Sequence, residues 1–373
     1  MKRVLLAALL LAAGQAGAVE NRGVTEDNLP NFFEALKDRM TFPLAYDGGD
    51  PAAWRERVLP QVSSLILPYD AMRPYQAEVI DAVDRGTYTA QRIAFNITDE
   101  SRITALLLTP KGEGPFPSAL MLHDHGSRFD IGKEKWISPW YDADRLVSAT
   151  EWSDKYFSGR FPGDGLAERG YVVLATDALG WGDREGNGYE AQQALAANLF
   201  NLGSSMAGLM ALEDVRASEF LASLPETDPE KVTAVGFSMG AFRAWQVAAL
   251  SPVISATVAN GWMAESKSLM APGNNQLRGQ SAFTMLHPGL LSLLDFPDVA
   301  ALAAPNPMLV YVGEEDPLFP ASGVQAAMTK MQAVWDAYGS DTPLTTRLWE
   351  GKAHTFTADM QDAAFDWLDE QIR

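Results

Sequence analysis

The segment GFSMG, at residues 236–240, places a serine between two glycines. The apolar run Val232–Val235 precedes it, and an apolar-periodic segment that begins near Met239 follows it. A Gly-x-Ser-x-Gly turn from a strand into a helix is typical of a nucleophile elbow, whose strained backbone projects the serine oxygen beyond the sheet edge. Bulk at either glycine would clash with such a turn. The pattern therefore favours Ser238 as a nucleophile over a serine in a merely tight turn.

Two further groups follow predicted strands in the order that this chemistry needs. Asp316 lies in GEEDPLFP after the run NPMLVYVG, and His354 lies in GKAHTF after the run PLTTRLWEG. Glu314 and Glu315 are rivals of Asp316 in the same loop, and acidic residues before a proline are also ordinary turn formers. The order serine, aspartate, histidine along the chain is that of the α/β-hydrolases. The sequence thus predicts a triad of Ser238, Asp316 and His354.

These three side chains would divide the work of a hydrolysis reaction between them. A serine hydroxyl is a poor nucleophile until a base removes its proton. His354 would be that base, and then the acid that protonates the leaving group, while Asp316 would fix the imidazole tautomer and stabilise the imidazolium.

The negative charge that develops on the attacked carbonyl oxygen needs preorganised donors. One candidate is the backbone N–H of Met239, at a helix N-terminus. The other lies in the loop HDHG after the run SALML, where we favour the N–H of His125, with Asp124 as its rival. A His-x-His pair could instead hold a metal ion, but no third ligand is recognisable, so we expect neither a metal nor a cofactor. The ring of His123 is expected to brace the loop.

The composition excludes several other classes of protein. With 373 residues and 47% hydrophobic content, the chain can bury a sizeable core. It contains no cysteine, so no thiol can be a nucleophile or a metal ligand. The formal net charge of −19 repels phosphate backbones, and no basic stripe with interleaved aromatic residues is present, so we expect no nucleic-acid partner.

The N-terminal segment has the features of a secretory signal. Lys2 and Arg3 precede the apolar run Val4–Ala13, and the small-x-small triplet Ala16-Gly17-Ala18 follows. The run is too short to span a bilayer comfortably. We therefore expect residues 1–18 to be cleaved and the mature protein to be periplasmic or secreted, with no membrane insertion.

The elements that must position these residues are read from apolar spacing. Residues 19–86 are predicted as a helical extension, followed by an antiparallel pair in TYTAQRIAFNIT and SRITALLLTP. Short apolar runs then alternate with helical segments, which predicts a mainly parallel sheet covered on both faces. We expect one domain over residues 19–373, with insertions at 127–163 and 261–289 near the active site.

The ordered set of motifs resembles the α/β-hydrolase superfamily, in the region shared by dienelactone-hydrolase-like proteins and bacterial acetyl xylan esterase-like enzymes. The matching segments, from about Thr87 to the C-terminus, are LMLHDHGSRFDIGKEK, LAERGYVVLATDALGWGDREG, GLMALEDVRASEFLASLPETDPEKVTAVGFSMGAFRA, LAAPNPMLVYVGEEDPLFP and GKAHTF. The resemblance implies the α/β-hydrolase fold, the same triad and cofactor-free ester hydrolysis. Asp124 stands where such loops commonly carry glycine. Dienelactone hydrolases proper use a cysteine nucleophile, so their specific activity is not implied.

The insertions supply candidate substrate contacts. Trp136 and Trp140 lie in the first insertion and Trp262 in the second, where aromatic rings could stack on sugar rings or simply pack the insertions onto the body. Export, acidity and esterase chemistry together suggest a small-molecule or carbohydrate ester as the substrate, such as an acetylated carbohydrate. The alternatives are a serine peptidase of the prolyl-peptidase kind and a non-catalytic binding protein. The sequence does not indicate an oligomeric state.

Overall fold

The computed structural model describes residues 23–184, 188–279, 281–339 and 343–372. By its internal contacts the chain divides after Met40 into two units. In the first unit, the described residues form an isolated bridge between Val24 and Pro30 and the short helix α1 (Phe33–Asp38). The predicted signal segment 1–18 lies outside the described residues.

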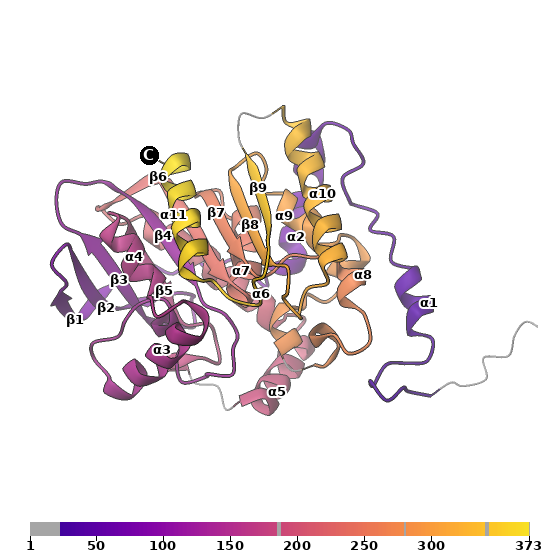
Figure 1. Cartoon of the computed structure of the whole chain (residues 1–373), viewed down its shortest axis with the longest axis horizontal. Helices are drawn as coiled ribbons and strands as arrows, with labels where there is room; N and C mark the ends of the chain where they lie inside the picture. The colour runs from indigo at the N-terminus through magenta and orange to yellow at the C-terminus, as the bar shows by residue number, and fades with distance from the viewer. Residues whose placement is uncertain (1–22, 185–187, 280, 340–342, 373) are drawn as a thin grey trace, which may run out of the picture. The chain divides into compact units, whose positions relative to one another are not determined.

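The second unit, from Thr41 onward, contains a central sheet. Its described strands follow the order β1-β2-β3-β5-β4-β6-β7-β8-β9 (Figure 1). Pairs from β1 to β5 along this order are antiparallel, and all the pairs from β5 to β9 are parallel. The strands are β1 (Glu78–Asp84), β2 (Tyr88–Asn96), β3 (Arg102–Pro110), β4 (Phe116–Leu122), β5 (Val172–Thr176), β6 (Thr227–Phe237), β7 (Ile254–Asn260), β8 (Met308–Gly313) and β9 (Leu344–Trp349).

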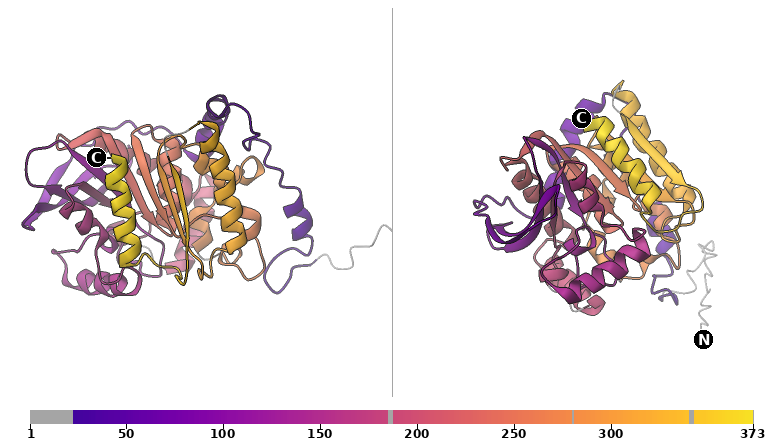
Figure 2. Two further views of the ribbon diagram at one scale, coloured as in Figure 1. Left: turned by 45° about the horizontal axis from the view of Figure 1, so that its top comes forward. Right: turned by 60° about the vertical axis from the view of Figure 1, so that its left-hand side comes forward.

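Helices cover both faces of this sheet (Figures 1 and 2). They are α2 (Pro51–Ile66), α3 (Ala143–Tyr156), α4 (Pro162–Glu168), α5 (Gly188–Asn201), α6 (Met206–Ala222), α7 (Met239–Leu250), α8 (Ser266–Leu269), α9 (Phe296–Ala301), α10 (Ala321–Ala337) and α11 (Ala358–Ile372). One apolar core gathers side chains from α2, α6, α7, α9 and α10, and a second gathers side chains from α3, α4 and α11.

Strand β4 shows why the sheet needs two covered faces. Leu120 and Leu122 belong to the first core, whereas Ala119 and Met121 belong to the second. Successive side chains of a strand point to opposite faces, so a run of apolar residues requires apolar partners on both sides. The mainly parallel sheet between two helical layers confirms the α/β fold predicted from the sequence.

The N-terminal part differs from the sequence prediction in two respects. Residues 19–86 were expected to be a helical extension, but β1 lies at their end and pairs antiparallel with β2. The prediction of helix was therefore wrong for residues 78–84. The strand was missed because β1 is an exposed edge strand without a clear apolar alternation. The single domain expected from residue 19 also differs from the structure, in which the larger unit begins at Thr41.

In the described part of the chain, no single helix is long and apolar enough to cross a membrane. Helices α5 and α6 reach that length and composition only as a pair, which is bent by 84°.

Candidate active site

Ser238 occupies the turn between β6 and α7 with a positive φ, at φ 56° and ψ −124°. Its glycine neighbours are required by close backbone contacts. A Cβ on Gly236 would lie 1.9 Å from the carbonyl oxygen of Gly240, and one on Gly240 would lie 1.7 Å from that of Leu122 in β4. The strand-to-helix context and the clash predicted from the sequence are both present.

A continuous hydrogen-bonded chain joins Ser238, His354 and Asp316. His354 Nε2 lies 2.8 Å from Ser238 Oγ, and His354 Nδ1 lies 2.6 Å from Asp316 Oδ2. A carboxylate can only accept, so Nδ1–H donates to Asp316 and Nε2 is left to accept from the serine hydroxyl. The structure thus brings together the three residues predicted as a triad, in the relation that activates a serine.

The loops after three parallel strands place these groups at one edge of the sheet. Ser238 follows β6, Asp316 follows β8 and His354 follows β9. Asn260, at the end of β7, ties them together: its carbonyl oxygen accepts from the N–H of Ser238 at 2.8 Å, and its Nδ2 donates to the carbonyl oxygen of Thr355 at 3.0 Å. Loops at the carboxyl ends of parallel strands are where such sheets carry their sites.

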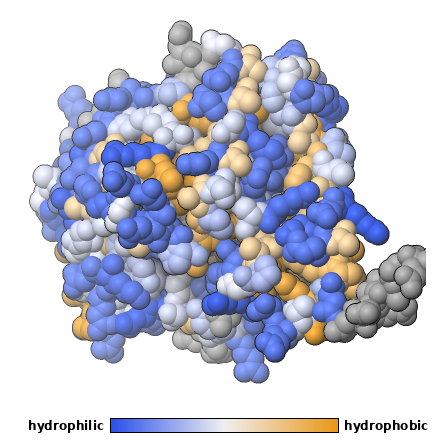
Figure 3. Space-filling model, turned by 45° about the vertical axis from the view of Figure 1, so that its right-hand side comes forward, coloured by the Kyte–Doolittle hydropathy of each residue, from blue (hydrophilic) through white to orange (hydrophobic). Residues whose placement is uncertain are grey.

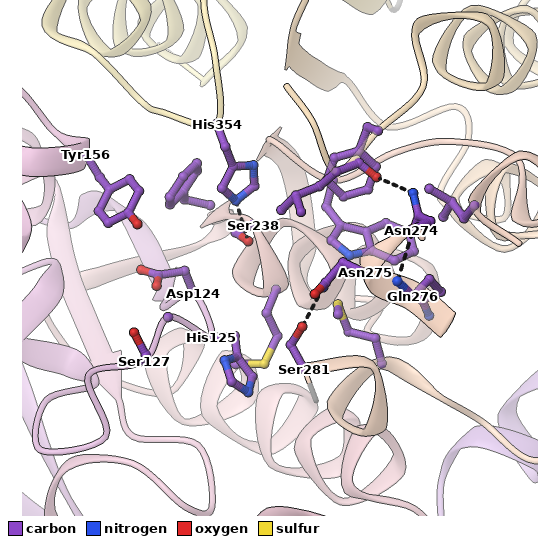
Figure 4. Close-up of a pocket in the computed structure, with 18 of the residues that line it drawn as sticks. Asp124, His125, Ser127, Tyr156, Ser238, Asn274, Asn275, Gln276, Ser281 and His354 are labelled. Carbon is purple, nitrogen blue, oxygen red and sulfur yellow. Dashed lines mark hydrogen bonds between the residues drawn. The ribbon is translucent and has the colours of Figure 1, made fainter. Parts of the chain in front are cut away.

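A cavity of about 220 Å³ opens over Ser238. Figure 4 shows Tyr156, Asp124 and Ser127 on one side of Ser238 and Asn274 and Gln276 on the other. The remaining lining residues are His125, Gly126, Trp152, Tyr189, Phe237, Met239, Trp262, Leu269, Asn275, Ser281, Met285, Leu318, Phe319 and His354. Both insertions therefore contribute to the wall of the cavity.

The loop after β4 carries two neutral histidines. His123 Nδ1 lies 2.8 Å from the carbonyl oxygen of Asp124, and its Nε2 accepts from the N–H of Ala178 at 2.9 Å, which assigns the proton to Nδ1. Burial holds the pKa of His123 well below its usual value. Burial also lowers the pKa of His125, to about 4, while its Nε2 lies 2.9 Å from Gln192 Oε1. The His123 ring braces this loop, as its sequence position suggested.

A cluster of buried charges lies directly behind that loop. Lys133 contacts Asp177 at 2.5 Å, Asp183 at 2.9 Å and Glu134 at 3.0 Å. Burial opposes the charge on Lys133, but the surrounding carboxylates outweigh it and raise the pKa of this lysine. Lys135 contacts Asp124 at 3.2 Å and is also fully buried.

Two of the three tryptophans proposed as substrate contacts lie elsewhere, so this prediction was wrong for Trp136 and Trp140. Trp136 is fully buried and stacks on Phe157 with ring centres 5.2 Å apart. Trp140 donates from Nε1 to Asp81 Oδ1 at 2.8 Å, beside β1. Packing of the first insertion onto the body, the alternative reading, accounts for both. Trp262 does line the cavity.

Several cavity residues were missed by sequence reasoning. The second insertion supplies a polar wall of the cavity. This wall consists of Asn274, Asn275 and Gln276, at the start of the 3-10 helix Asn275–Leu277. Asn275 Nδ2 donates to Ser281 Oγ at 2.6 Å, and Gln276 Nε2 is buried without a partner among the described residues. The run of three amides between glycines was the signal that could have found them.

Among the described residues, no group of three or more histidine, cysteine, aspartate or glutamate side chains is arranged to hold a metal ion. The rings of His123 and His125 bond to different partners, Ala178 and Gln192.

The sequence of this chain is similar to a known protein family and to a bacterial relative. Residues 162–368 match the model of the dienelactone hydrolase family. YtaP of Bacillus subtilis (strain 168), named as a candidate hydrolase, is 29% identical over 269 residues, covering 72% of this chain and 83% of YtaP.

Two solved structures share the fold. A Bacteroides fragilis NCTC 9343 protein named as a candidate acetyl xylan esterase superposes with a TM-score of 0.69 at 16% identity, covering 88% of this chain and 84% of the other. The glucuronoyl esterase from Solibacter usitatus gives a TM-score of 0.61 at 16% identity, covering 89% of this chain and 98% of the other.

Proposed function

The chain belongs to the dienelactone hydrolase family and is a serine-type carboxylic ester hydrolase, and on that premise we propose that Ser238, His354 and Asp316 are its catalytic triad. The observation that carries the proposal is the chain of hydrogen bonds in which His354 joins Ser238 Oγ at 2.8 Å to Asp316 at 2.6 Å. The strained backbone of Ser238 supports it, because such strain concentrates at functional positions.

In this proposal Ser238 Oγ attacks the ester carbonyl carbon while its proton passes to His354 Nε2. The carbonyl oxygen becomes an oxyanion, held by the backbone N–H groups of Met239 and His125. Met239 is the first residue of α7, so its N–H has no partner within the helix. Collapse breaks the bond to the alcohol, which takes the proton from His354 and leaves an acyl-enzyme. Water, deprotonated by His354, then releases the acid and restores Ser238.

The substrate is proposed to be an acyl ester of a polyhydroxylated alcohol, such as an acetylated sugar. The polar wall of Asn274, Asn275 and Gln276 supports this, because it carries a buried donor, Gln276 Nε2, that has no partner among the described residues. A site that hydrogen-bonds a substrate hydroxyl strongly rejects analogues that lack it. Trp262 and Phe319 offer apolar surface to the same ligand.

Replacement of Gln276 by leucine tests this substrate class. We expect Gln276→Leu to lower kcat/KM for a monoacetylated sugar by roughly 10-fold or more, because a hydroxyl of the substrate loses its donor. The same variant should hydrolyse p-nitrophenyl acetate at nearly the wild-type rate, since that leaving group lacks hydroxyls. The matched control is Gln325→Leu, an exposed position on α10. Equal losses on both esters would contradict the assignment of the polar wall, and no hydrolysis of either ester would contradict esterase activity.

The protein is also proposed to be exported, with cleavage after Ala18. The basic start, short apolar run and small residues of the N-terminal segment support this.

A further inference from the structure

Lys135 makes contacts that no step of the hydrolysis uses. Its Nζ lies 3.1 Å from the carbonyl oxygen of Asp124, 3.1 Å from the carbonyl oxygen of His125 and 3.2 Å from Asp124 Oδ1. A lysine ammonium has three N–H donors, and these three oxygens are enough to satisfy all of them. The side chain is fully buried and sits 4.6 Å from the centre of the Trp152 ring. Burying a lysine is costly, so these contacts need an explanation.

The two carbonyl groups that Lys135 holds belong to the loop beside Ser238. In a trans peptide the C=O and the N–H that follows it point in opposite directions. The described cis bonds are only Gly114-Pro115 and Ala304-Pro305, so both loop peptides are trans. Whatever anchors the Asp124 carbonyl therefore aims the N–H of His125 the other way. The anchor on the His125 carbonyl does the same for the N–H of Gly126.

Lys135 is not part of the cavity wall, whereas Asp124, His125 and Gly126 all line it. The ammonium thus holds the loop from its buried side and leaves its amide groups to the cavity side. His123 Nδ1–H and Trp181 Nε1–H reinforce the same two carbonyls, at 2.8 Å each. We infer that Lys135 is a positioning residue that orients the His125 N–H as an oxyanion donor. This inference rests on the proposed function.

Selective labelling of the wild-type protein gives a direct test. The chain has four histidines, and only His125 follows an aspartate. Protein carrying ¹³C-carbonyl aspartate and ¹⁵N histidine therefore gives one correlated amide signal, that of the Asp124–His125 peptide. Phenylboronic acid is the probe: Ser238 Oγ adds a lone pair to boron, its proton passes to His354, and no group leaves. The adduct carries the negative charge of the tetrahedral state.

We expect the His125 amide proton to move downfield when the boronic acid binds. An unmoved signal in a protein that does bind the probe would overturn the inference while leaving the esterase proposal intact. Failure of the wild type to bind the probe or to hydrolyse any ester would instead contradict the proposed function.

Kinetics of Lys135→Met test the role of the lysine itself. We expect kcat to fall by about 10- to 1000-fold, up to the loss seen when one oxyanion donor is removed, with KM within about threefold. The Ki of the boronic acid should rise by the factor by which kcat/KM falls. A merely structural role would lower the active fraction and leave Ki unchanged, which would overturn the inference.

Three further variants make the result independent of folding losses. Lys133→Met removes an equally buried lysine of the same cluster that does not touch the loop carbonyls, and it should leave the boronic acid Ki within about threefold of wild type. In Lys135→Met the carboxylate of Asp124 loses its cation. The double variant Asp124→Asn/Lys135→Met removes this carboxylate as well, and it should still show the loss in kcat. A double variant equal to Asp124→Asn alone in kcat and Ki would overturn the inference.

Discussion

At the scale of single residues, the site depends on a strained backbone that its surroundings hold in place. A non-glycine residue with φ 56° costs about 1–3 kcal/mol. The N–H of Ser238 donates to the carbonyl oxygen of Asn260, and the carbonyl oxygen of Ser238 accepts from the N–H groups of Ala241 and Phe242. Because backbone groups make all these bonds, replacing Ser238 by alanine should remove the hydroxyl and keep the turn.

His287 carries a pH-dependent stability prediction. Burial lowers its pKa from 6.5 to about 3, and its Nε2 lies 2.7 Å from Gln246 Oε1. The unfolded chain takes up a proton at this residue below pH 6.5, whereas the folded protein does not until about pH 3. This residue's contribution to stability is therefore lost progressively as the pH falls through that window.

The measurement is urea unfolding of wild type and His287→Asn at pH 7.5 and 4.5. Asparagine keeps an N–H donor for Gln246 but does not titrate. We expect the stability advantage of the wild type to shrink by about 2–3 kcal/mol at the lower pH. All other titrating groups are common to both proteins and cancel in the difference. An advantage that does not change with pH would contradict the prediction.

At the scale of elements, β4, β6 and α7 approach so closely that only glycine fits between them. We expect Gly240→Ala to lower the free energy of unfolding by about 3 kcal/mol or more, because its Cβ would meet a β4 backbone oxygen at 1.7 Å. The control is Gly165→Ala in α4, whose Cβ would lie 3.7 Å from the Phe365 ring, and helix propensity predicts no loss there. Thermal unfolding of both variants measures this difference in stability. Equal unfolding midpoints for the two variants would contradict the prediction.

The elements that the sequence could predict are those defined by local patterns. The run 232–235 and the helix from Met239 were predicted because buried parallel strands are apolar throughout and the elbow glycines mark the turn. The strand was longer than expected, as it begins at Thr227 before the apolar run. The antiparallel pair β2 and β3 was predicted from its alternation and short connection, and its register confirms it.

The insertions could not be predicted in the same way. Trp136 and Trp152 lie in one insertion and are both apolar aromatic residues, yet only Trp152 reaches the cavity. Which of them does so depends on how α3 packs against the body, and that is a tertiary choice without a periodic signal. The polar wall at 274–276 escaped prediction because asparagine and glutamine in a glycine-bounded loop also form ordinary turns.

At the scale of the whole molecule, the acidic composition is compatible with a protein that works outside the cell. The net charge is −19, and removal of Lys2 and Arg3 with a signal peptide makes it −21. Hydrophilic side chains cover much of the face shown in Figure 3, with apolar side chains visible between them. Such a charge favours solvation over binding to anionic surfaces.

Export makes a definite prediction about the mature chain. Expressed in a bacterial host, the protein should be recovered outside the cytoplasm with Val19 as its first residue, as intact mass shows. Ala18→Leu should block cleavage, because signal peptidase accepts small residues at that position, whereas Ala13→Leu should not. A cytoplasmic protein that begins at Met1 would refute the export proposal without touching the catalytic one.

The most direct test of the central claim is hydrolysis of p-nitrophenyl esters, acetate through octanoate, by the mature protein and by Ser238→Ala. We expect the wild type to cleave the short esters best, because the cavity is only about 220 Å³. We also expect Ser238→Ala to lose at least about 1000-fold in kcat while remaining folded. Equal rates for the two proteins would show that Ser238 is not the nucleophile and would contradict the catalytic assignment.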